Sequence, residues 1–334
     1  MRKTKKGKIV KRSTSTIVLL FIIFELVFTS ITGPFMVYYG PFKNVKTTVV
    51  GSAMTTLTLQ WLATSFLSDE KIQEIMNEQK GEVIVQEDSN NKDSGVKIEN
   101  KNDNSIERYD VTGKKYKGYI LVIKDPTRVK VGYSSKLGTE GQLTSEIAKY
   151  NNAIAAVNGG GFTDEAYVGT GAKPAGIIMS NGKEIHNDIK SENQETQVVA
   201  LTKSGNLLVG MHTVKEMRKL DVTEAVSFGP ALIVNGKKTI KNGNGEWGIA
   251  PRTAIAQRKD GAIILLVIDG RQINSIGASL REVQDLLYDY GAVNATNLDG
   301  GSSSTLFYND EVINNPCDSL GERTVPSIIY VESR

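Results

Sequence analysis

The sequence predicts an α/β or α+β domain built around a large, mixed, strand-rich sheet with packed helices, preceded by an N-terminal transmembrane helix. Three observations predict it: a 24-residue apolar run near the N-terminus, short β-type runs joined by Asn-Gly and Asp-Gly turns, and a few segments with helical spacing. The chain has 334 residues, of which 40% are hydrophobic, so it can bury a sizeable core.

A basic segment and a long apolar run open the chain. Residues 16–39 read TIVLLFIIFELVFTSITGPFMVYY, with Glu25 as the one charged residue. As a helix this run would extend about 36 Å at about 1.5 Å per residue, enough to cross the hydrocarbon layer of a bilayer. Residues 1–15 precede it as a basic tail with seven positive charges: Arg2, Lys3, Lys5, Lys6, Lys8, Lys11 and Arg12. Such residues mark the cytoplasmic side, so we expect a single-pass cell-membrane protein whose folded domain lies outside.

Two other interpretations of residues 16–39 remain open, a cleaved signal peptide and a buried helix of a soluble domain. The run is longer than a usual signal h-region and lacks a clear small-x-small cleavage site. A core helix rarely follows so basic a tail. An uncleaved transmembrane anchor is therefore the expectation.

Residues 40–80 predict a helical segment beside the membrane. Its uncharged part, residues 47–68, is rich in Thr and Ser and makes a poor membrane span, although whether it enters the membrane stays open. Ser68 or Asp69 can cap a new helix over SDEKIQEIMNEQ. Residues 81–108 are rich in Asn, Asp, Lys and Ser, a composition that predicts a flexible linker.

Residues 109–334 predict a strand-rich domain. Helical spacing appears in GQLTSEIAKY, in TVKEMRKL and most clearly in SLREVQDLLYDYG, which Gly291 ends. Because this last helix lies between two apolar runs, strand, helix and strand form a crossover unit. Hairpin turns are expected at Asn181-Gly182, at Asn235-Gly236 and at Asp260-Gly261.

Charge and cysteine content exclude several classes of function. The formal net charge is +3, and removing the seven charges of the tail leaves the rest of the chain at −4. A mildly acidic domain has no basic face for nucleic acid. Cys317 is the only cysteine, which excludes an intramolecular disulfide, a thiolate zinc site and an iron–sulfur cluster. We expect no cofactor, although a divalent cation held by Asp269, Asp299 or Asp164 stays open because hard cations need only oxygen ligands.

Three glycine-rich turns follow predicted strands. They place Asn158, Asp269 and Asp299 at strand ends, where the loops of an open sheet gather into a ligand crevice. An isolated strand that ends in D-G or N-G is usually only a tight turn. The three segments are AVNGGGF at 156–162, VIDGRQ at 267–272 and NLDGGSSSTLF at 297–307.

The third turn carries further chemistry, which two arginines complement. Gly300 and Gly301 allow the backbone to approach a ligand closely. Arg252 and Arg271 flank predicted strands, and a guanidinium matches phosphate or carboxylate oxygens in a bidentate fashion. A surface ion pair is the alternative for such arginines and fits Arg258, which sits at a hairpin tip. The hydroxyls that can donate to phosphate or sugar oxygens are those of Ser302, Ser303 and Ser304.

These blocks together resemble the phosphodiester glycosidase family. The resemblance rests on NLDGGSSSTL, AVNGGGF, PRTAIA, LVIDGRQ, GPALIVNGK and SLREVQDLL and spans about residues 110–334. The chain has Gly161 and Ser302 where the family pattern has Phe and Gly. The resemblance implies hydrolysis of the bond between a sugar's anomeric carbon and a phosphodiester, on a cell-surface or secreted glycoconjugate. Many bacterial relatives are linked to exopolysaccharide biosynthesis.

The chemistry of that reaction suggests roles for the candidate residues. Asp299 or Asp269 would act as nucleophile or as base for water, and Arg252, helped by Arg271, would stabilise the departing phosphate. Glu282 is a weaker candidate because helical glutamates are usually solvated. The groups expected to hold sugar or phosphate oxygens are the Asn158 side chain, the amides of Gly159 and Gly160, and the hydroxyls of residues 302–304.

Two other functions remain open at this point. One is a noncatalytic glycan-binding module for exopolysaccharide assembly, and the other is a phosphodiesterase that cleaves the P–O bond. Loss of Asp299 would abolish turnover by an enzyme but leave part of a binder's affinity. Solvent-oxygen labelling distinguishes C–O cleavage from P–O cleavage.

Overall fold

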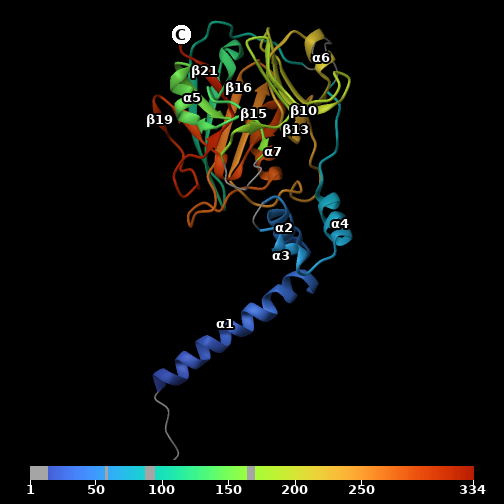
Figure 1. The fold of residues 1–334 in the computed structure, drawn as a ribbon, viewed down its shortest axis with the longest axis vertical. Coiled ribbons are helices and arrows are strands. Elements are labelled where there is room, and N and C mark those ends of the chain that lie inside the picture. The colour runs from blue at the N-terminus through green and yellow to red at the C-terminus, as the bar shows by residue number, and fades with distance from the viewer. Residues whose placement is uncertain (1–13, 57–58, 87–94, 164–169) are drawn as a thin grey trace, which may run out of the picture.

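A computed structural model describes residues 14–56, 59–86, 95–163 and 170–334. Most of the basic tail and Asp164 therefore lie outside the described residues. Figure 1 shows a strand-rich domain, a long N-terminal helix that projects from it, and short helices between the two.

The projecting helix is α1 (Thr14–Tyr39). In the part of the chain that the structure describes, it is the one helix long and apolar enough to cross a membrane, and none of its most apolar window is buried. A buried core helix, one of the interpretations left open by the sequence, does not fit this exposure.

Three short helices follow α1 and share a small core of their own. This core contains Tyr38 from the end of α1 together with apolar residues of the three helices, among them Val50 and Ile72. Ser68 caps the last helix, because its hydroxyl accepts a hydrogen bond from the Lys71 amide. The helices are α2 (Lys43–Met54), α3 (Trp61–Thr64) and α4 (Asp69–Gln79).

The strands of the described chain form three larger antiparallel sheets and two small ribbons. A seven-stranded sheet has the order β1 (Ile106–Thr112), β2 (Lys117–Ile123), β16 (Ile263–Ile268), β15 (Arg252–Arg258), β17 (Ala292–Leu298), β13 (Ala231–Val234) and β14 (Lys237–Lys238). A five-stranded sheet has the order β11 (Leu207–His212), β10 (Thr196–Thr202), β12 (Val222–Val226), β8 (Ile177–Ser180) and β9 (Lys183–Asn187). Another has the order β19 (Glu311–Val312), β18 (Leu306–Tyr308), β5 (Ala153–Asn158), β21 (Ser327–Glu332) and β3 (Val129–Tyr133). The ribbons pair β4 (Gln142–Leu143) with β20 (Thr324–Val325), and β6 (Phe162–Thr163) with β7 (Lys173–Pro174).

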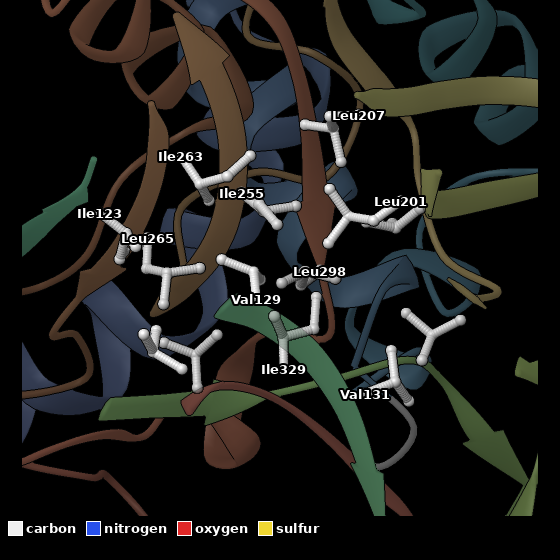
Figure 2. Packing of buried hydrophobic residues seen from close by; sticks show 14 of the residues in the cluster. Ile123, Val129, Val131, Leu201, Leu207, Ile255, Ile263, Leu265, Leu298 and Ile329 are labelled. Atoms are coloured by element: carbon white, nitrogen blue, oxygen red, sulfur yellow. The ribbon is translucent and has the colours of Figure 1, made fainter. Parts of the chain in front are cut away.

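All three larger sheets turn one face toward a shared core. Figure 2 shows residues of this core, which come from strands of every one of these sheets. Strand β16, with the sequence IILLVI, is buried on both faces: Ile263, Leu265 and Val267 enter the shared core, and the residues between them pack on the opposite side. Alternation along a strand accounts for this division.

A helix covers the outer face of each larger sheet. Leu280, Val283 and Leu287 of α7 (Leu280–Asp289) pack on the seven-stranded sheet. Val214 and Met217 of α6 (Val214–Lys219) pack on the sheet that contains β10. Helix α5 (Thr144–Tyr150) packs on the sheet that contains β5.

The predicted fold class is confirmed, while the strands are arranged differently in two respects: they form three larger sheets instead of one, and the described strands pair only antiparallel instead of in a mixed sheet. The expected hairpins form at Asn181, Asn235 and Asp260, and α7 joins β16 to β17 as a crossover. These two strands run parallel to each other on either side of β15, to which both are antiparallel. The strands divide among three larger sheets because β5 and β18 pair with the C-terminal β21, or with each other, instead of with the seven-stranded sheet.

Residues 81–86 and 95–105 contact the domain rather than standing clear of it. Gln86 is buried and its side-chain amide bonds Leu207 O and the Val209 amide. The Lys97 amide donates to Lys259 O. These contacts differ from the free linker that composition predicts, because backbone hydrogen bonds to the domain compensate for the low apolar content.

Candidate active site

Three of the predicted residues lie at one edge of the seven-stranded sheet. Arg252 opens β15 and pairs with the last residue of β16. The next residue, Thr253, pairs with the last residue of β17. Asp269 and Asp299 therefore directly follow the two strands that flank Arg252.

A cleft of about 1450 Å³ opens at this edge. The predicted residues that line it are Arg252, Arg271, Asp299, Gly300, Gly301 and Ser302. Other parts of its wall come from the aromatic residues Phe162, Phe228 and Trp247, from the charged residues Glu246, Asp318, Glu322 and Arg323, and from Ser52, Thr55, Thr56, Leu59 and Met76 of the N-terminal helical segment.

Arg252 is buried and held by backbone carbonyls. Its Nε donates to Ala278 O at 3.0 Å, and its Nη2 donates to Trp247 O at 2.9 Å and to Gly248 O at 2.8 Å. Within the described chain no acceptor and no carboxylate is paired with Nη1. The guanidinium is therefore fixed on one side and has two donors left for a ligand in the cleft.

The charge of Arg252 has no protein counter-ion among the described residues. Burial, assisted by repulsion from Arg271, lowers the pKa of its guanidinium to about 9, so it remains charged at neutral pH. A buried charge is costly unless an opposite charge pairs with it. The site is therefore suited to an anionic ligand.

Asp299 is half-buried in the wall of the cleft. Burial raises the pKa of its carboxyl to about 6, against the opposing effects of the Ser303 hydroxyl, the charge of Arg323 and the Gly300 amide. The Ser303 hydroxyl is close enough to act on the carboxyl, although it forms no hydrogen bond of standard geometry. A carboxyl with this pKa is mostly ionised at pH 7 yet can hold a proton in a reaction.

Arg271 lies in the wall of the cleft, beside the turn that contains Gly300 and Gly301. Its Nη1 donates to Ser302 Oγ at 3.3 Å, and its own backbone is left-handed, with φ of 56°. Such a backbone is uncommon for a residue other than glycine. Gly301 also has a positive φ, and a Cβ there would lie 3.3 Å from Arg271 Nη2. The turn thus packs closely against a second guanidinium, which is exposed to solvent.

Asp269 does not line the cleft. It is 4% exposed, and its Oδ1 accepts hydrogen bonds from Asn314 Nδ2 at 3.1 Å and from the Asn315 amide at 3.0 Å. Its backbone carbonyl accepts a bond from Ser275 Oγ. The carboxylate therefore anchors the loop that follows β19, a position that favours a structural task over contact with substrate.

Asn158 joins two sheets beneath the cleft. It is fully buried, its Nδ2 donates to Asp299 O at 2.6 Å, and its Oδ1 accepts from Thr253 Oγ1 and from the Thr305 amide. The amides of Gly159 and Gly160, expected to hold ligand oxygens, both donate to Ser327 instead. These residues position Asp299 rather than face the cleft.

The three serines at 302–304 also differ in whether they line the cleft. Ser302 lines the cleft, whereas Ser303 and Ser304 are 1% and 2% exposed and do not. Glu282 is also used structurally, since its carboxylate accepts from the Ser279 amide and hydroxyl in the N-terminal cap of α7.

Four charged residues that line the cleft, Glu246, Asp318, Glu322 and Arg323, are not among the predicted site residues, and two of them bear on its electrostatics. Arg323 lies over the ring of Phe162 at 4.8 Å and lowers the pKa of the Asp299 carboxyl. Glu246 is half-buried with a positive φ of 71°, and burial raises the pKa of its carboxyl. The glycine-flanked segment GNGEWG was the available signal for Glu246, because a residue held in a left-handed backbone between glycines is often functional.

The N-terminal helical segment holds the loop that orients Arg252, which we call the 241–250 loop. The Ile249 amide donates to Ser52 Oγ at 3.2 Å, and Thr55 Oγ1 donates to Trp247 O at 3.4 Å. A Cβ on Gly51 would lie 2.3 Å from Glu246 O, so only glycine fits there. Two of the contacted residues, Trp247 and Glu246, also line the cleft.

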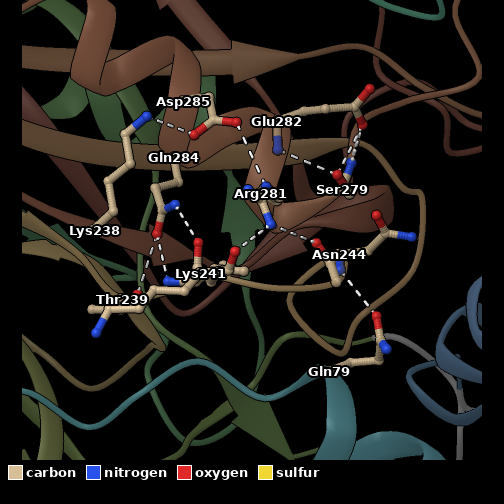
Figure 3. A network of polar contacts seen from close by, with 12 residues as sticks. Gln79, Lys238, Thr239, Lys241, Asn244, Ser279, Arg281, Glu282, Gln284 and Asp285 are labelled. Atoms are coloured by element: carbon tan, nitrogen blue, oxygen red, sulfur yellow. Dashed lines mark hydrogen bonds and ion pairs between the residues drawn. The ribbon is translucent and has the colours of Figure 1, made fainter.

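Figure 3 shows the other end of this loop held between α4 and α7. The Asn244 amide donates to Gln79 Oε1 at 3.0 Å, and Arg281 Nη1 donates to Lys241 O at 2.8 Å. Gln284 of α7 adds a bond to the Ile240 amide. Helices α4 and α7 therefore hold the 241–250 loop, whose carbonyl oxygens accept hydrogen bonds from Arg252.

No cluster of three His, Cys, Asp or Glu side chains suited to a metal ion occurs among the described residues. Asp164, one of the residues considered for a cation, lies outside the described residues. Asp269 uses its Oδ1 on protein donors.

Known proteins resemble this chain in sequence and in fold. Residues 151–332, more than half of the chain, match the family model described as phosphodiester glycosidase. The catalytic domain of zebrafish N-acetylglucosamine-1-phosphodiester alpha-N-acetylglucosaminidase superposes with a TM-score of 0.56 at 25% identity, covering 69% of this chain and 83% of that domain.

Two curated relatives match over shorter stretches. The bovine N-acetylglucosamine-1-phosphodiester alpha-N-acetylglucosaminidase is 28% identical over 190 residues, which is 52% of this chain and 34% of that protein. The SPbeta prophage-derived uncharacterized protein YomE of Bacillus subtilis is 36% identical over 78 residues, 23% of this chain and 12% of that protein. The chain thus spans about a third of the bovine protein's length and about an eighth of YomE's. By the family match, the chain belongs to the phosphodiester glycosidase family.

Proposed function

We propose that this protein hydrolyses a sugar-1-phosphodiester at the glycosidic C–O bond. The observation that carries the proposal is the buried Arg252 guanidinium, whose Nη1 has no partner among the described residues, in the same cleft as the Asp299 carboxyl. The first is suited to a phosphate and the second to nucleophilic or basic catalysis at the anomeric carbon.

The arginines would act on the leaving group. A phosphodiester carries one negative charge, and breaking its bond to the anomeric carbon leaves the second charge on the departing phosphate. Arg252 is preorganised by three carbonyl contacts, so it need not reorient as this charge develops. Arg271 and Ser302, which line the same cleft, would add donors. With this stabilisation the leaving group needs little protonation.

Asp299 would act on the other side of the anomeric carbon. As a base, its ionised carboxyl takes a proton from water while the water oxygen bonds to that carbon. As a nucleophile, it forms a glycosyl ester that water then hydrolyses. In both routes the sugar gains the water oxygen and the phosphate leaves as a monoester. Asn158 would hold the Asp299 backbone in place.

Glu246 supplies a second carboxyl to the cleft. Burial raises the pKa of this carboxyl, which favours a protonated form. It would therefore be the group to assist a poor leaving group, a task that Asp269 cannot perform from behind the cleft wall.

We also propose that α1 anchors the protein in the cell membrane, with the domain outside and a glycoconjugate of the cell surface, such as an exopolysaccharide, as substrate. The length and exposure of α1 and the seven basic residues before it support this orientation.

Turnover by the full chain tests the proposal. The probe is methyl alpha-N-acetylglucosamine-1-phosphodiester, and the variants are Asp299→Asn and Arg252→Ala beside the unaltered protein. We expect release of the sugar by the unaltered protein and loss of turnover in both variants. Equal turnover in all three would contradict the proposed site, whereas binding of the probe without turnover would favour a glycan-binding module.

A further inference from the structure

We infer that the substrate is membrane-borne: a sugar-1-phosphodiester whose second ester is carried by a molecule anchored in the same bilayer as α1. The inference rests on the proposed function and on α1 as the anchor. It adds that the enzyme binds its substrate at the bilayer surface, and that the second ester of the phosphate is attached to a membrane-anchored molecule.

The first observation is that the cleft and the anchor share one structural segment. Ser52, Thr55 and Thr56, in and just after α2, line the cleft, and the first residue of α2 follows the end of α1 by four positions. The 12 residues of α2 extend about 18 Å at about 1.5 Å per residue. This wall of the cleft therefore lies within about one short helix of the bilayer surface.

The second observation is that this segment is fixed against the end of α1. The ring of Phe66 stacks on Tyr38 with centroids 4.9 Å apart and meets Phe35 edge-on at 6.1 Å. The hydroxyl of Tyr38 donates to Leu62 O, and that of Tyr39 donates to Phe66 O. Residues 62–66 thus lie beside the last turn of α1, at the depth where a membrane helix meets the headgroups. Figure 1 shows α2 and α3 between α1 and the domain.

The third observation is an apolar rim between the anchor and the cleft. Phe42 is 49% exposed, Trp61 is 58% exposed and Leu59, which lines the cleft, is 42% exposed. Leu320, which also lines the cleft, is 92% exposed. Exposed aromatic residues beside a spanning helix are typical of the membrane interface. A cleft that served only dissolved polymer would gain nothing from these side chains, whereas a bilayer surface would cover them.

The experiment uses the full chain reconstituted into phosphatidylcholine vesicles with three presentations of one sugar phosphate. N-acetylglucosamine-1-phosphate is supplied as its soluble methyl ester, as a long-chain isoprenyl ester in the same vesicles, and as that isoprenyl ester in separate vesicles. At equal total concentration we expect the same-vesicle ester to be cleaved at least about tenfold faster than the other two, because anchoring raises its effective concentration at the cleft.

Two variants distinguish a contribution of the apolar rim to the rate from the effect of placing enzyme and substrate in the same vesicle. Phe42→Ser combined with Trp61→Ser should slow cleavage of the same-vesicle ester severalfold and leave the methyl ester unaffected. Tyr150→Ser, which removes an aromatic residue that is 78% exposed on the distant α5, should change neither rate.

The outcomes distinguish this inference from the proposed function. Equal rates for the methyl ester and the same-vesicle ester, or an effect of the double variant on both alike, would overturn the inference and leave the proposed function standing. Cleavage of none of the probes would overturn both.

Discussion

Asp299 and Arg252 carry opposite charges at neighbouring strand ends. Burial raises the pKa of Asp299 and lowers that of Arg252, and both shifts favour the neutral form of the side chain. The pKa of Asp299, about 6, lies nearer to neutral pH than that of Arg252, about 9. Its reactive form in either proposed route is the ionised one.

The pKa of Asp299 predicts the acid limb of the pH profile. Because its carboxyl has a pKa of about 6, the ionised fraction falls as the pH drops below that value. We expect kcat/KM to decrease about tenfold per pH unit below about pH 6. Initial rates with the methyl phosphodiester measure this limb. A profile that stays flat down to pH 4 would exclude Asp299 as base or nucleophile.

Arg252→Lys tests whether the fork of the guanidinium is required. A lysine ammonium has three donors and cannot bridge Ala278, Trp247 and Gly248 while also binding phosphate. We expect kcat/KM to fall about 100- to 1000-fold. Arg258→Lys, at the other end of β15 and paired with Asp260, is the matched control and should leave kcat/KM unaltered. Similar activities of the two variants would contradict the assignment.

Asp269→Asn separates a structural carboxyl from a catalytic one. Both protein donors reach Oδ1, and an asparagine oxygen can accept them equally well. We therefore expect Asp269→Asn to keep kcat/KM within about tenfold and to lose about 1 kcal/mol of unfolding free energy at most. Chemical denaturation and initial rates measure the two quantities. A loss as large as that of Asp299→Asn would place Asp269 in the chemistry.

The positions of these side chains in the structure could be predicted only in part from the sequence. Turn chemistry indicated that Asn158, Asp269 and Asp299 end strands, and the structure agrees. It could not show which side chains enter the cleft, because N-G and D-G turns look alike in sequence. Strand order accounts for Asn158 alone: β5 belongs to another sheet, and the buried Asn158 side chain bonds Thr253.

At the scale of elements, the 241–250 loop connects the N-terminal helices to Arg252. Its carbonyls orient Arg252, while Ser52 and Gly51 of α2 hold its backbone. A displacement of α2 should therefore move the Arg252 guanidinium.

Gly51→Ala tests this connection. The added Cβ would lie 2.3 Å from Glu246 O, so the loop must move. We expect kcat to fall about 10- to 100-fold, because a misplacement of about 1 Å is costly in catalysis. Gly33→Ala in α1 is the control, since its Cβ would lie 4.0 Å from the nearest side chain. An unaffected kcat in Gly51→Ala, with both variants folded by circular dichroism, would show that α2 does not govern Arg252.

Local elements were predicted well and long-range ones poorly. Hairpins and the capped α7 depend on neighbouring residues, so their turns and spacing appear directly in the sequence. The pairing of β5 with β21 joins residues near 155 to residues near 330, and no local pattern encodes it. The Thr- and Ser-rich helices also gave no sign that their small residues pack against the 241–250 loop.

At the scale of the whole molecule, Figure 1 shows α1, the short helices after it and the strand-rich domain following one another along the structure. The domain boundaries at residues 15, 39, 80 and 108 stay predictions. Residues 81–86 contact the domain, and α2 contributes to the cleft, so a fragment that begins at residue 108 would lack part of the cleft wall. Activity should therefore be measured on the full chain.

The most direct test of C–O cleavage is hydrolysis of the methyl phosphodiester in ¹⁸O-labelled water, followed by mass spectrometry of both products. We expect the label to enter the sugar hydroxyl, the methyl phosphate to stay unlabelled, and Asp299→Asn to yield neither product. Label in the phosphate would contradict the proposed reaction, because it would show attack at phosphorus and P–O cleavage.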